Sequence, residues 1–312
     1  MITINEKSYE IPKTWNDLSL KQLIACYSVI MHPFTTLLPA GEEMIFKRIE
    51  LTKIILELDD DFMLKWKADC LQADKEDGEL IFEQELQEVA KVITDFAFEL
   101  LPKESDLDPD QYKIGLTLTN CPWPLIENTE ADLYNQKYHA PADELENLTL
   151  YELGSALLTF ERFVQEEDED YADELIAILY RPPKQETVAN LWSDYQGDKR
   201  LPYYKHESTV KKRKEYIKKL PQAVKQIILF WFASCREQII KDYENIFVKE
   251  KGKKMGGNDY AYAGLILQLA NGIANVDQVA TSNFHNAFTY LSMLEDQRKQ
   301  REIEEQMKRL NR

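Results

Sequence analysis

The sequence predicts a mainly α-helical protein of many helices, with one small β-hairpin at the N-terminus. The chain holds 10 glycines and 12 prolines in 312 residues, about 7% together, against roughly 12% in an average protein. Apolar side chains recur every three or four residues through most of the chain, which is the spacing of one buried helix face. Alternation of apolar and polar residues, the pattern of a strand, is clearest in the first eleven residues. With 44% hydrophobic residues, the helices have ample side chains for a core.

Residues 1–101 are predicted to form the hairpin and a first set of helices. Residues 2–11 alternate around a polar turn, as a short hairpin does. Asp17 or Ser19 can cap the first helix, because each can accept hydrogen bonds from free backbone amides. The helices are expected near residues 20–31, 41–58, 61–74 and 82–101, and Pro102 ends the last of them.

Residues 102–145 are predicted to be an irregular connector. Helical spacing is poor here, and the segment holds Pro102, Pro109, Pro122, Pro124 and Pro141. Residues 113–118 are compatible with a short strand that pairs with the N-terminal hairpin. A domain boundary is expected within this connector.

Residues 146–294 are predicted to form a second helical part. Helices are expected near residues 148–165, 171–180, 209–248, 260–270 and 276–294, with the long third one bent at Pro221. Residues 295–312 are almost wholly charged and are predicted to form a helical tail. In this tail Ile303, Met307 and Leu310 fall on one helix face.

Two short sequences match at an offset of 130 residues. Asp17-Leu18-Ser19-Leu20 and Asn147-Leu148-Thr149-Leu150 share a hydroxyl residue between two leucines. A duplicated unit explains the match, but so does the common composition of helix starts, in which a hydroxyl caps the first turn. The sequence favours the second explanation.

The formal net charge of −17 disfavours nucleic acid as a partner, since an acidic surface repels phosphate. Residues 205–219 are locally basic and allow a phosphate-binding patch. The alternative is a solvated helix face that pairs with the acidic run of residues 166–170, and we favour it. No apolar run reaches the ~18 residues of a membrane span, and no secretion signal is visible. A soluble protein of the cytoplasm is expected.

No catalytic, cofactor or metal site is predicted. The four cysteines are far apart in sequence, and none of the four histidines has the spacing of a zinc motif. His206-Glu207-Ser208 holds a base beside a hydroxyl, but nothing in the sequence fixes the geometry that a nucleophile needs. A protein that is not an enzyme is therefore expected. A hidden acid–base pair stays open, because sequence does not show burial.

Several stretches together resemble proteins of phage tail morphogenesis. They are residues 2–5, 9–12 and 15–20, residues 177–182 and 199–203, Leu220-Pro221 ahead of the aromatic Phe230-Trp231-Phe232, and an ending of residues 265–271, Leu291 and a charged C-terminal tail. The ending is similar to that of tail assembly chaperones. The resemblance touches about a third of the chain in scattered pieces. It implies a non-enzymatic assembly factor, in the cytoplasm of the host cell, that binds the apolar helices of a tape-measure-type tail protein and keeps it soluble.

Partner-binding residues are expected on two apolar faces. One holds Tyr262, Leu265 and Leu269, and the other is the tail stripe of Ile303, Met307 and Leu310. The tail can dock on a tail protein, on a second copy of the chain or on its own body, or it can be a frayed terminal helix. A structural virion component, such as a connector or tail-completion protein, and an undetected enzyme are the alternative functions.

Overall fold

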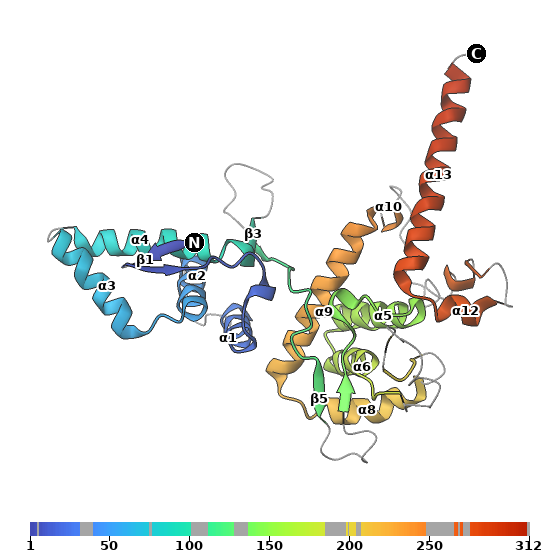
Figure 1. The fold of residues 1–312 in the computed structure, drawn as a ribbon, viewed down its shortest axis with the longest axis horizontal. Helices are drawn as coiled ribbons and strands as arrows, with labels where there is room; N and C mark the ends of the chain where they lie inside the picture. Colours follow the sequence, from blue (N-terminus) through green and yellow to red (C-terminus); the bar gives the residue numbers. More distant parts are fainter. Residues whose placement is uncertain are drawn as a thin grey trace, which may run out of the picture. The chain divides into compact units, whose positions relative to one another are not determined.

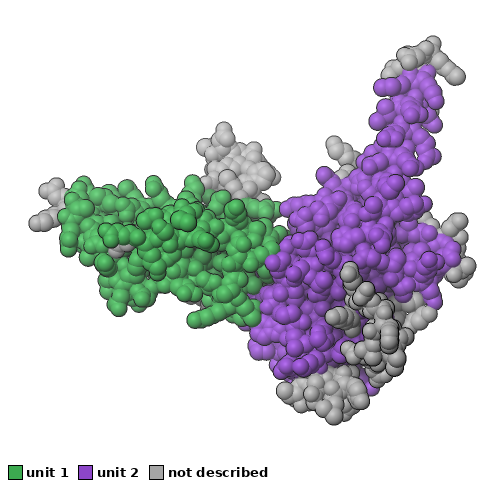
Figure 2. All heavy atoms as spheres, viewed as in Figure 1, with its two compact units in different colours: residues 1–118 green, residues 119–312 purple. Residues whose placement is uncertain are grey.

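The computed structural model describes residues 1–4, 6–31, 40–74, 77–100, 112–127, 137–184, 198, 200–203, 207–247, 265–267, 269–270 and 275–310. They fall into two units, residues 1–118 and residues 119–312 (Figure 2). The boundary lies within the segment predicted as a connector. The fold is mainly α-helical with a small N-terminal hairpin, as the sequence predicts (Figure 1).

Unit 1 begins with the predicted hairpin. Strands β1 (Ile2–Ile4) and β2 (Lys7–Tyr9) pair antiparallel, with Ile2 opposite Tyr9. Ile4 and Tyr9 are buried, and the ring of Tyr9 meets that of Phe62 edge-on. The alternation in the sequence therefore reflects one strand face turned toward the helices.

The helices of unit 1 are α1 (Leu20–Met31), α2 (Ala40–Leu56), α3 (Asp60–Ala73) and α4 (Gly78–Ile93), after the short η1 (Trp15–Asp17). Helix α4 packs against α2 and α3, and α1 packs against α2. The approach of α3 to α4 depends on Gly78, where a Cβ atom would lie 2.6 Å from the Cα of Leu71. Asp59 caps α3 by accepting a hydrogen bond from the Phe62 amide, as expected for an acidic helix start.

The predicted helix of residues 82–101 is wrong at its C-terminal end. Helix α4 stops at Ile93, and the Thr94 hydroxyl donates to the Ala90 carbonyl at 2.6 Å. After η2 (Asp95–Ala97), strand β3 (Phe98–Leu100) pairs antiparallel with β4 (Tyr112–Ile114). Residues 112–114 therefore pair with β3 and not with the hairpin. In β3 the buried Phe98 is followed by the exposed Glu99, and this alternation is typical of a strand and not of the predicted helix.

Unit 2 is built on a helical core. Strands β5 (Leu125–Glu127) and β6 (Lys137–His139) pair antiparallel and precede η3 (Asp143–Leu145). Helices α5 (Leu150–Glu166) and α6 (Glu169–Leu179) pack together, and α8 (Val210–Ile217) and α9 (Gln222–Asp242) pack on α6. Trp231 and Phe232 of α9 are fully buried in this core.

The predicted bent helix of residues 209–248 is three helices. After η4 (Glu207–Thr209), α8 ends at Ile217, α9 begins behind Pro221, and α10 (Glu244–Phe247) follows. Proline lacks an amide hydrogen and disfavours helical backbone in the residue before it. It therefore separates the helices here instead of bending one of them.

The predicted helix of residues 276–294 is also divided. Helix α12 (Val276–Ala280) is short, and α13 (Phe284–Leu310) continues for 27 residues through the charged tail. Among the described residues, no helix is long and apolar enough to cross a membrane.

The two matching sequences at an offset of 130 residues both start a helix. The Gln22 amide donates to the Ser19 hydroxyl at 3.3 Å, and the Glu152 amide donates to the Thr149 hydroxyl at 3.2 Å. A shared capping hydroxyl accounts for the match locally.

Candidate functional site

The N-terminal half of α13 is fixed to unit 2. The Phe284 amide donates to the Leu148 carbonyl at 3.2 Å, and the Leu150 amide donates to the Ser282 carbonyl at 2.9 Å. Phe284 and Phe288 are buried, and the Phe288 ring meets Phe247 of α10 edge-on. The base of α13 is therefore part of the core.

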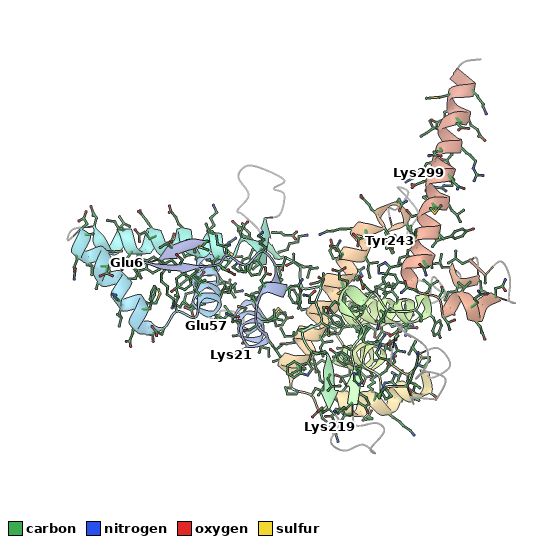
Figure 3. The ribbon with its side chains drawn as sticks, in the orientation of Figure 1. Glu6, Lys21, Glu57, Lys219, Tyr243 and Lys299 are labelled. Carbon is green, nitrogen blue, oxygen red and sulfur yellow. The ribbon has the colours of Figure 1, made fainter. Side chains whose placement is uncertain are left out.

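Polar contacts extend this attachment along α10. The hydroxyl of Tyr243, which is labelled in Figure 3, lies 2.9 Å from Nδ1 of His285 in the first turn of α13. Asn245 donates from its amide to the Ser292 hydroxyl at 2.6 Å and to the Asp296 carboxylate at 3.2 Å. The contacts between α10 and α13 thus reach as far as Asp296.

Beyond Asp296 the helix has no core to pack on. Every described side chain from Asp296 to Lys308 is exposed. Figure 1 shows this half of α13 extending away from the rest of unit 2. Its charged residues pair along the helix, with Arg298 2.8 Å from Glu295 and 3.8 Å from Glu302. Exposed ion pairs stabilise a helix only slightly, so this half is a weakly supported element.

Exposed apolar side chains, here together called the α13 face, occur as two pairs along the helix. One pair is near the base and the other is in the distal half, the wholly polar residues 295–302 separate them, and each of the four side chains is more than half exposed. They are Tyr290 at 54%, Met293 at 57%, Ile303 at 53% and Met307 at 60%. Leu294 flanks them at 40%. Large apolar side chains exposed on an otherwise charged helix are typical of a surface that binds another helix.

The predicted site residues fall in different places. Ile303 and Met307 lie one turn apart on α13, and the helix includes Leu310, whose side chain lies outside the described residues. Leu265 and Leu269 are half-buried, while Leu267 between them is 48% exposed. Tyr262 lies outside the described residues.

Sequence reasoning missed the proximal members of the α13 face. Tyr290 and Met293 were assigned to the end of a core helix, because apolar spacing changes after Leu294. The sequence holds no apolar residue from position 295 to 302, so no continuous periodicity links this pair to Ile303 and Met307.

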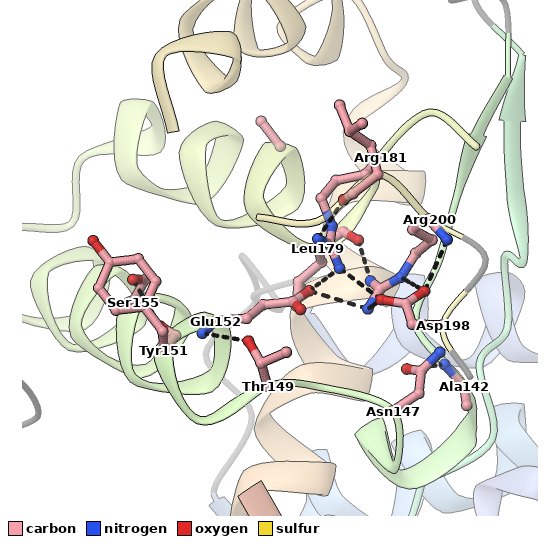
Figure 4. A network of polar contacts seen from close by, with 12 residues as sticks. Ala142, Asn147, Thr149, Tyr151, Glu152, Ser155, Leu179, Arg181, Asp198 and Arg200 are labelled. Carbon is pink, nitrogen blue, oxygen red and sulfur yellow. Dashed lines mark hydrogen bonds and ion pairs between the residues drawn. The ribbon is translucent and has the colours of Figure 1, made fainter. Parts of the chain in front are cut away.

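Apart from the α13 face, a cluster of charged side chains lies inside unit 2 (Figure 4). Arg181 donates from Nη2 to Glu152 Oε1 at 2.6 Å and to Asp198 Oδ2 at 3.0 Å. Arg200 holds Asp198 with two hydrogen bonds of 2.8 Å, and its Nη2 lies 3.1 Å from Glu152 Oε1. The cluster joins the first turn of α5 to the residues that follow α6 and to Asp198 and Arg200.

Backbone carbonyls complete the cluster. Arg181 donates to the Leu201 carbonyl and Arg200 to the Leu179 carbonyl, each at 2.6 Å. Within the described part of the chain, Arg181 Nε and Glu152 Oε2 have no hydrogen-bond partner. The remaining hydrogen-bonding capacity is thus small, and the cluster acts as a clamp on the fold.

Burial and charge oppose each other at these groups. Burial raises the pKa of the Glu152 carboxyl, and the charges of Arg200 and Arg181 limit the rise. Burial also acts against ionisation of Asp198, but hydrogen bonds and charge from Arg200 outweigh it, so the pKa of Asp198 is lowered. Burial lowers the pKa of Arg213 to about 10, with the nearby charge of Arg181 adding to the effect. The Arg200 and Arg181 guanidinium groups therefore favour the ionised form of Asp198 and offset part of the effect of burial on Glu152.

Sequence reasoning did not find this cluster. Arg181 and Arg200 were noticed as parts of a resemblance, and Arg213 as part of a basic segment. Arg213 is instead buried, and its Nε donates to the Ala177 carbonyl at 2.9 Å.

Two lysines of the basic segment pair with the acidic run as expected. Lys214 contacts Asp170 and lies 2.9 Å from Glu174, and Lys218 lies 3.2 Å from Asp170. Hydrogen bonds and charge from these two lysines lower the pKa of Asp170. The prediction of a helix face paired with the acidic run is confirmed for Lys214 and Lys218.

No group of three or more potential metal ligands occurs among the residues that the structure describes. Comparisons of the chain with known protein families, with curated proteins and with solved structures found no match.

Proposed function

We propose that this chain is a non-enzymatic binding factor that docks on an apolar helix of a partner protein through the α13 face. The exposure of Tyr290, Met293, Ile303 and Met307 carries the proposal. Within each pair the spacing of three or four residues is that of the anchors used in helix-in-groove and helix-on-helix binding. Phe284 and Phe288 fix the base of the helix, which carries Tyr290 and Met293, while Ile303 and Met307 lie in the distal half that extends beyond this support.

The strength of one contact follows from burial. Complete burial of such a side chain contributes about 1.5–3 kcal/mol. The four side chains are already near half burial, so each contributes ~1 kcal/mol and the face contributes ~4 kcal/mol. Association itself costs at least about 4 kcal/mol in lost translational and rotational freedom, so a single contact of this size is weak. Several copies along one long helix would bind far more tightly through their combined contacts.

We infer that the partner is a tape-measure-type tail protein, and that the chain is a tail assembly chaperone of the host cytoplasm. The resemblance of scattered segments to phage tail-morphogenesis proteins supports this inference. So does the weakness of the single contact, because a chaperone has to leave when the tail tube forms around its client. A long helix with repeated apolar side chains offers many equivalent docking places.

A pull-down from cells that produce the encoding element tests the proposal. The tagged full chain is compared with the double variant Ile303→Asp/Met307→Asp, and bound proteins are identified by mass spectrometry. Val164→Asp is the matched control, because Val164 is 59% exposed on α5 of the same unit. We expect a long helical tail protein with the wild type and the control, and its loss with the double variant.

The composition of finished particles separates the two proposed roles. A chaperone is absent from purified particles, whereas a connector or tail-completion protein stays in them. Recovery of the chain in mature particles would replace the chaperone proposal with the structural one. If the double variant recovers the same tail protein as the wild type, the α13 face is not the binding surface in either role.

A further inference from the structure

A groove in unit 1 lies between the hairpin and the helices α3 and α4. It has a volume of about 320 Å³ and is lined by β1, by Trp66 and by one face of α4. This volume is at the low end of the ~300–1,000 Å³ range of ligand sites. The groove therefore fits one or two side chains of a bound segment.

One wall is the edge of a strand. Three consecutive residues, Ile2, Thr3 and Ile4, line the groove. Side chains alternate across a strand, so a wall of three consecutive residues includes the strand edge itself. Within the described residues β1 pairs with β2 alone. The edge is thus open to one more strand, which is the mode by which extended peptides add to a sheet.

The opposite wall of the groove is formed by α4 and carries two valines and two carboxylates. Val89 is half-buried and Val92 is 45% exposed, one turn apart on α4. Glu85 and Glu88 are exposed on the same helix face. Trp66 Nε1 donates to Glu85 Oε2 at 3.0 Å, which fixes the orientation of that carboxylate. Glu88 has no hydrogen bond or ion pair with any residue that the structure describes.

The charge of the groove selects the occupant. Residues 1–118 hold twice as many carboxylates as cationic side chains, so the field around unit 1 attracts cations. A lysine side chain packs its aliphatic stem on apolar surface and extends its ammonium group to a polar rim. Val89, Val92 and Ile2 offer that surface, and Glu85 and Glu88 offer the rim.

We propose that this groove binds an extended lysine-containing peptide segment of a partner protein, which pairs with β1 and directs a lysine toward Glu85 and Glu88. The surface lies in unit 1 and is independent of the α13 face.

Fluorescence anisotropy with the full chain tests this proposal. The probe is a labelled peptide, Gly-Val-Lys-Val-Lys-Val-Gly, and its counterpart has glutamate in place of lysine. Glu88→Lys reverses the charge in the groove. Glu83→Lys is the matched control, since Glu83 is exposed on α4 but does not line the groove. Circular dichroism checks the fold of each variant, and Glu88→Gln supplies a milder change.

We expect saturable binding of the lysine peptide, and no binding of the glutamate peptide. Glu88→Lys should weaken binding about tenfold and Glu88→Gln less, while Glu83→Lys changes it within about twofold. Amide exchange at residues 2–4 should slow when the peptide binds, because the strand edge becomes paired. The proposal is overturned by equal binding of the two peptides, by an equal effect of Glu83→Lys, or by no saturable binding.

Discussion

At the scale of single residues, the buried cluster of unit 2 places two arginines on one carboxylate. The side chains of Arg181 and Arg200 are each 2% exposed and that of Glu152 is 0% exposed. Removing such charges from water is costly, and the cost is recovered only when each charge keeps its partners. The cluster therefore makes the local fold intolerant of losing any one member.

Substitution of one member should be strongly destabilising. Arg181→Met leaves Glu152 and Asp198 short of a partner, and Glu152→Gln leaves two arginines facing a neutral group. We expect each change to lower the free energy of unfolding by about 3–5 kcal/mol. Urea denaturation followed by circular dichroism measures it. Arg298→Met is the control, since Arg298 is 52% exposed and its pairs should contribute less than ~1 kcal/mol. Equal losses from Arg181→Met and Arg298→Met would contradict the clamp.

Two histidines should make stability depend on pH. Burial lowers the pKa of His139 and of His285 from the usual 6.5. The unfolded chain then binds protons at higher pH than the folded chain. Their contribution to stability is complete above the usual pKa and is lost as pH falls through the lowered pKa. We expect the thermal midpoint to fall between about pH 7.5 and pH 5.5.

The variant His139→Gln/His285→Gln should show less of this fall. An unchanged pH dependence in the double variant would show that other groups cause it. The single variant His285→Gln also reports on the base of α13, because His285 contacts Tyr243.

Sequence predicts some of these residue roles and not others. Caps such as Asp59 and Thr149 are predictable, because their partners are three residues away in the chain. The partners of Glu152 lie about 30 and 50 residues away, and nothing local selects them. The burial of Arg213 is likewise not predictable, because its partner, the Ala177 carbonyl, is distant in sequence and its neighbours are lysines.

At the scale of elements, α13 is longer than its apolar pattern predicts. The tail after Leu294 is rich in Glu, Lys, Arg and Gln, all of which favour helix without needing a core. Pairs such as Arg298 with Glu295 add slightly to this preference. The sequence predicts a helix up to Leu294 and a separate helical tail from residue 295. In the structure one helix continues through this point, and only its packing against the core ends there.

The rate of amide hydrogen exchange should change along α13 at about Asp296. Amides of residues 285–296 are held by α10 and the core, so they should exchange slowly. Amides of residues 299–310 should exchange much faster in the free chain, because local opening there breaks no packing. Mass spectrometry of deuterated peptides measures both. Equal protection in the two halves of the free protein would contradict a weakly supported distal helix.

The end of α4 shows a limit of helical periodicity. Apolar residues continue at helical spacing through Phe96 and Leu100. Thr94 instead closes the helix, and Arg48 of α2 donates to its hydroxyl at 2.9 Å. A contact from another helix decides the boundary, and periodicity contains no information on it.

At the scale of the whole molecule, two cores account for the division at residue 118. In unit 1, Trp15 is buried and donates from Nε1 to the Gly115 carbonyl at 2.7 Å. In unit 2, Trp231 is buried and donates from Nε1 to the Thr119 carbonyl at 2.9 Å. Low helical periodicity and frequent proline indicate a boundary in this region, and the sequence also predicts one strand there, near residues 113–118, although it assigns that strand the wrong partner.

Each core should have its own unfolding transition. Trp15→Ala should lower the midpoint for unit 1, and Trp231→Ala that for unit 2, each by the loss of about 3–5 kcal/mol of packing. Differential scanning calorimetry resolves the two transitions, and each variant is the control for the other. A shift of both transitions by either substitution would show that the units unfold together.

The function remains a prediction that the α13 face supports. Sequence indicated Ile303 and Met307 as contact residues, and the structure shows them exposed on a helix that is fixed at its base. The nature of the partner rests on scattered resemblance, because a binding face selects a class of surface and not one protein.

Co-expression with a tape-measure-type tail protein of the encoding element tests the central claim most directly. The soluble fraction of that protein is measured with the wild-type chain, with Ile303→Asp/Met307→Asp and with Val164→Asp. The proposal predicts a soluble tail protein with the wild type and with Val164→Asp, and an insoluble one with the double variant. A tail protein that is equally soluble with all three, or insoluble with all three, would contradict it.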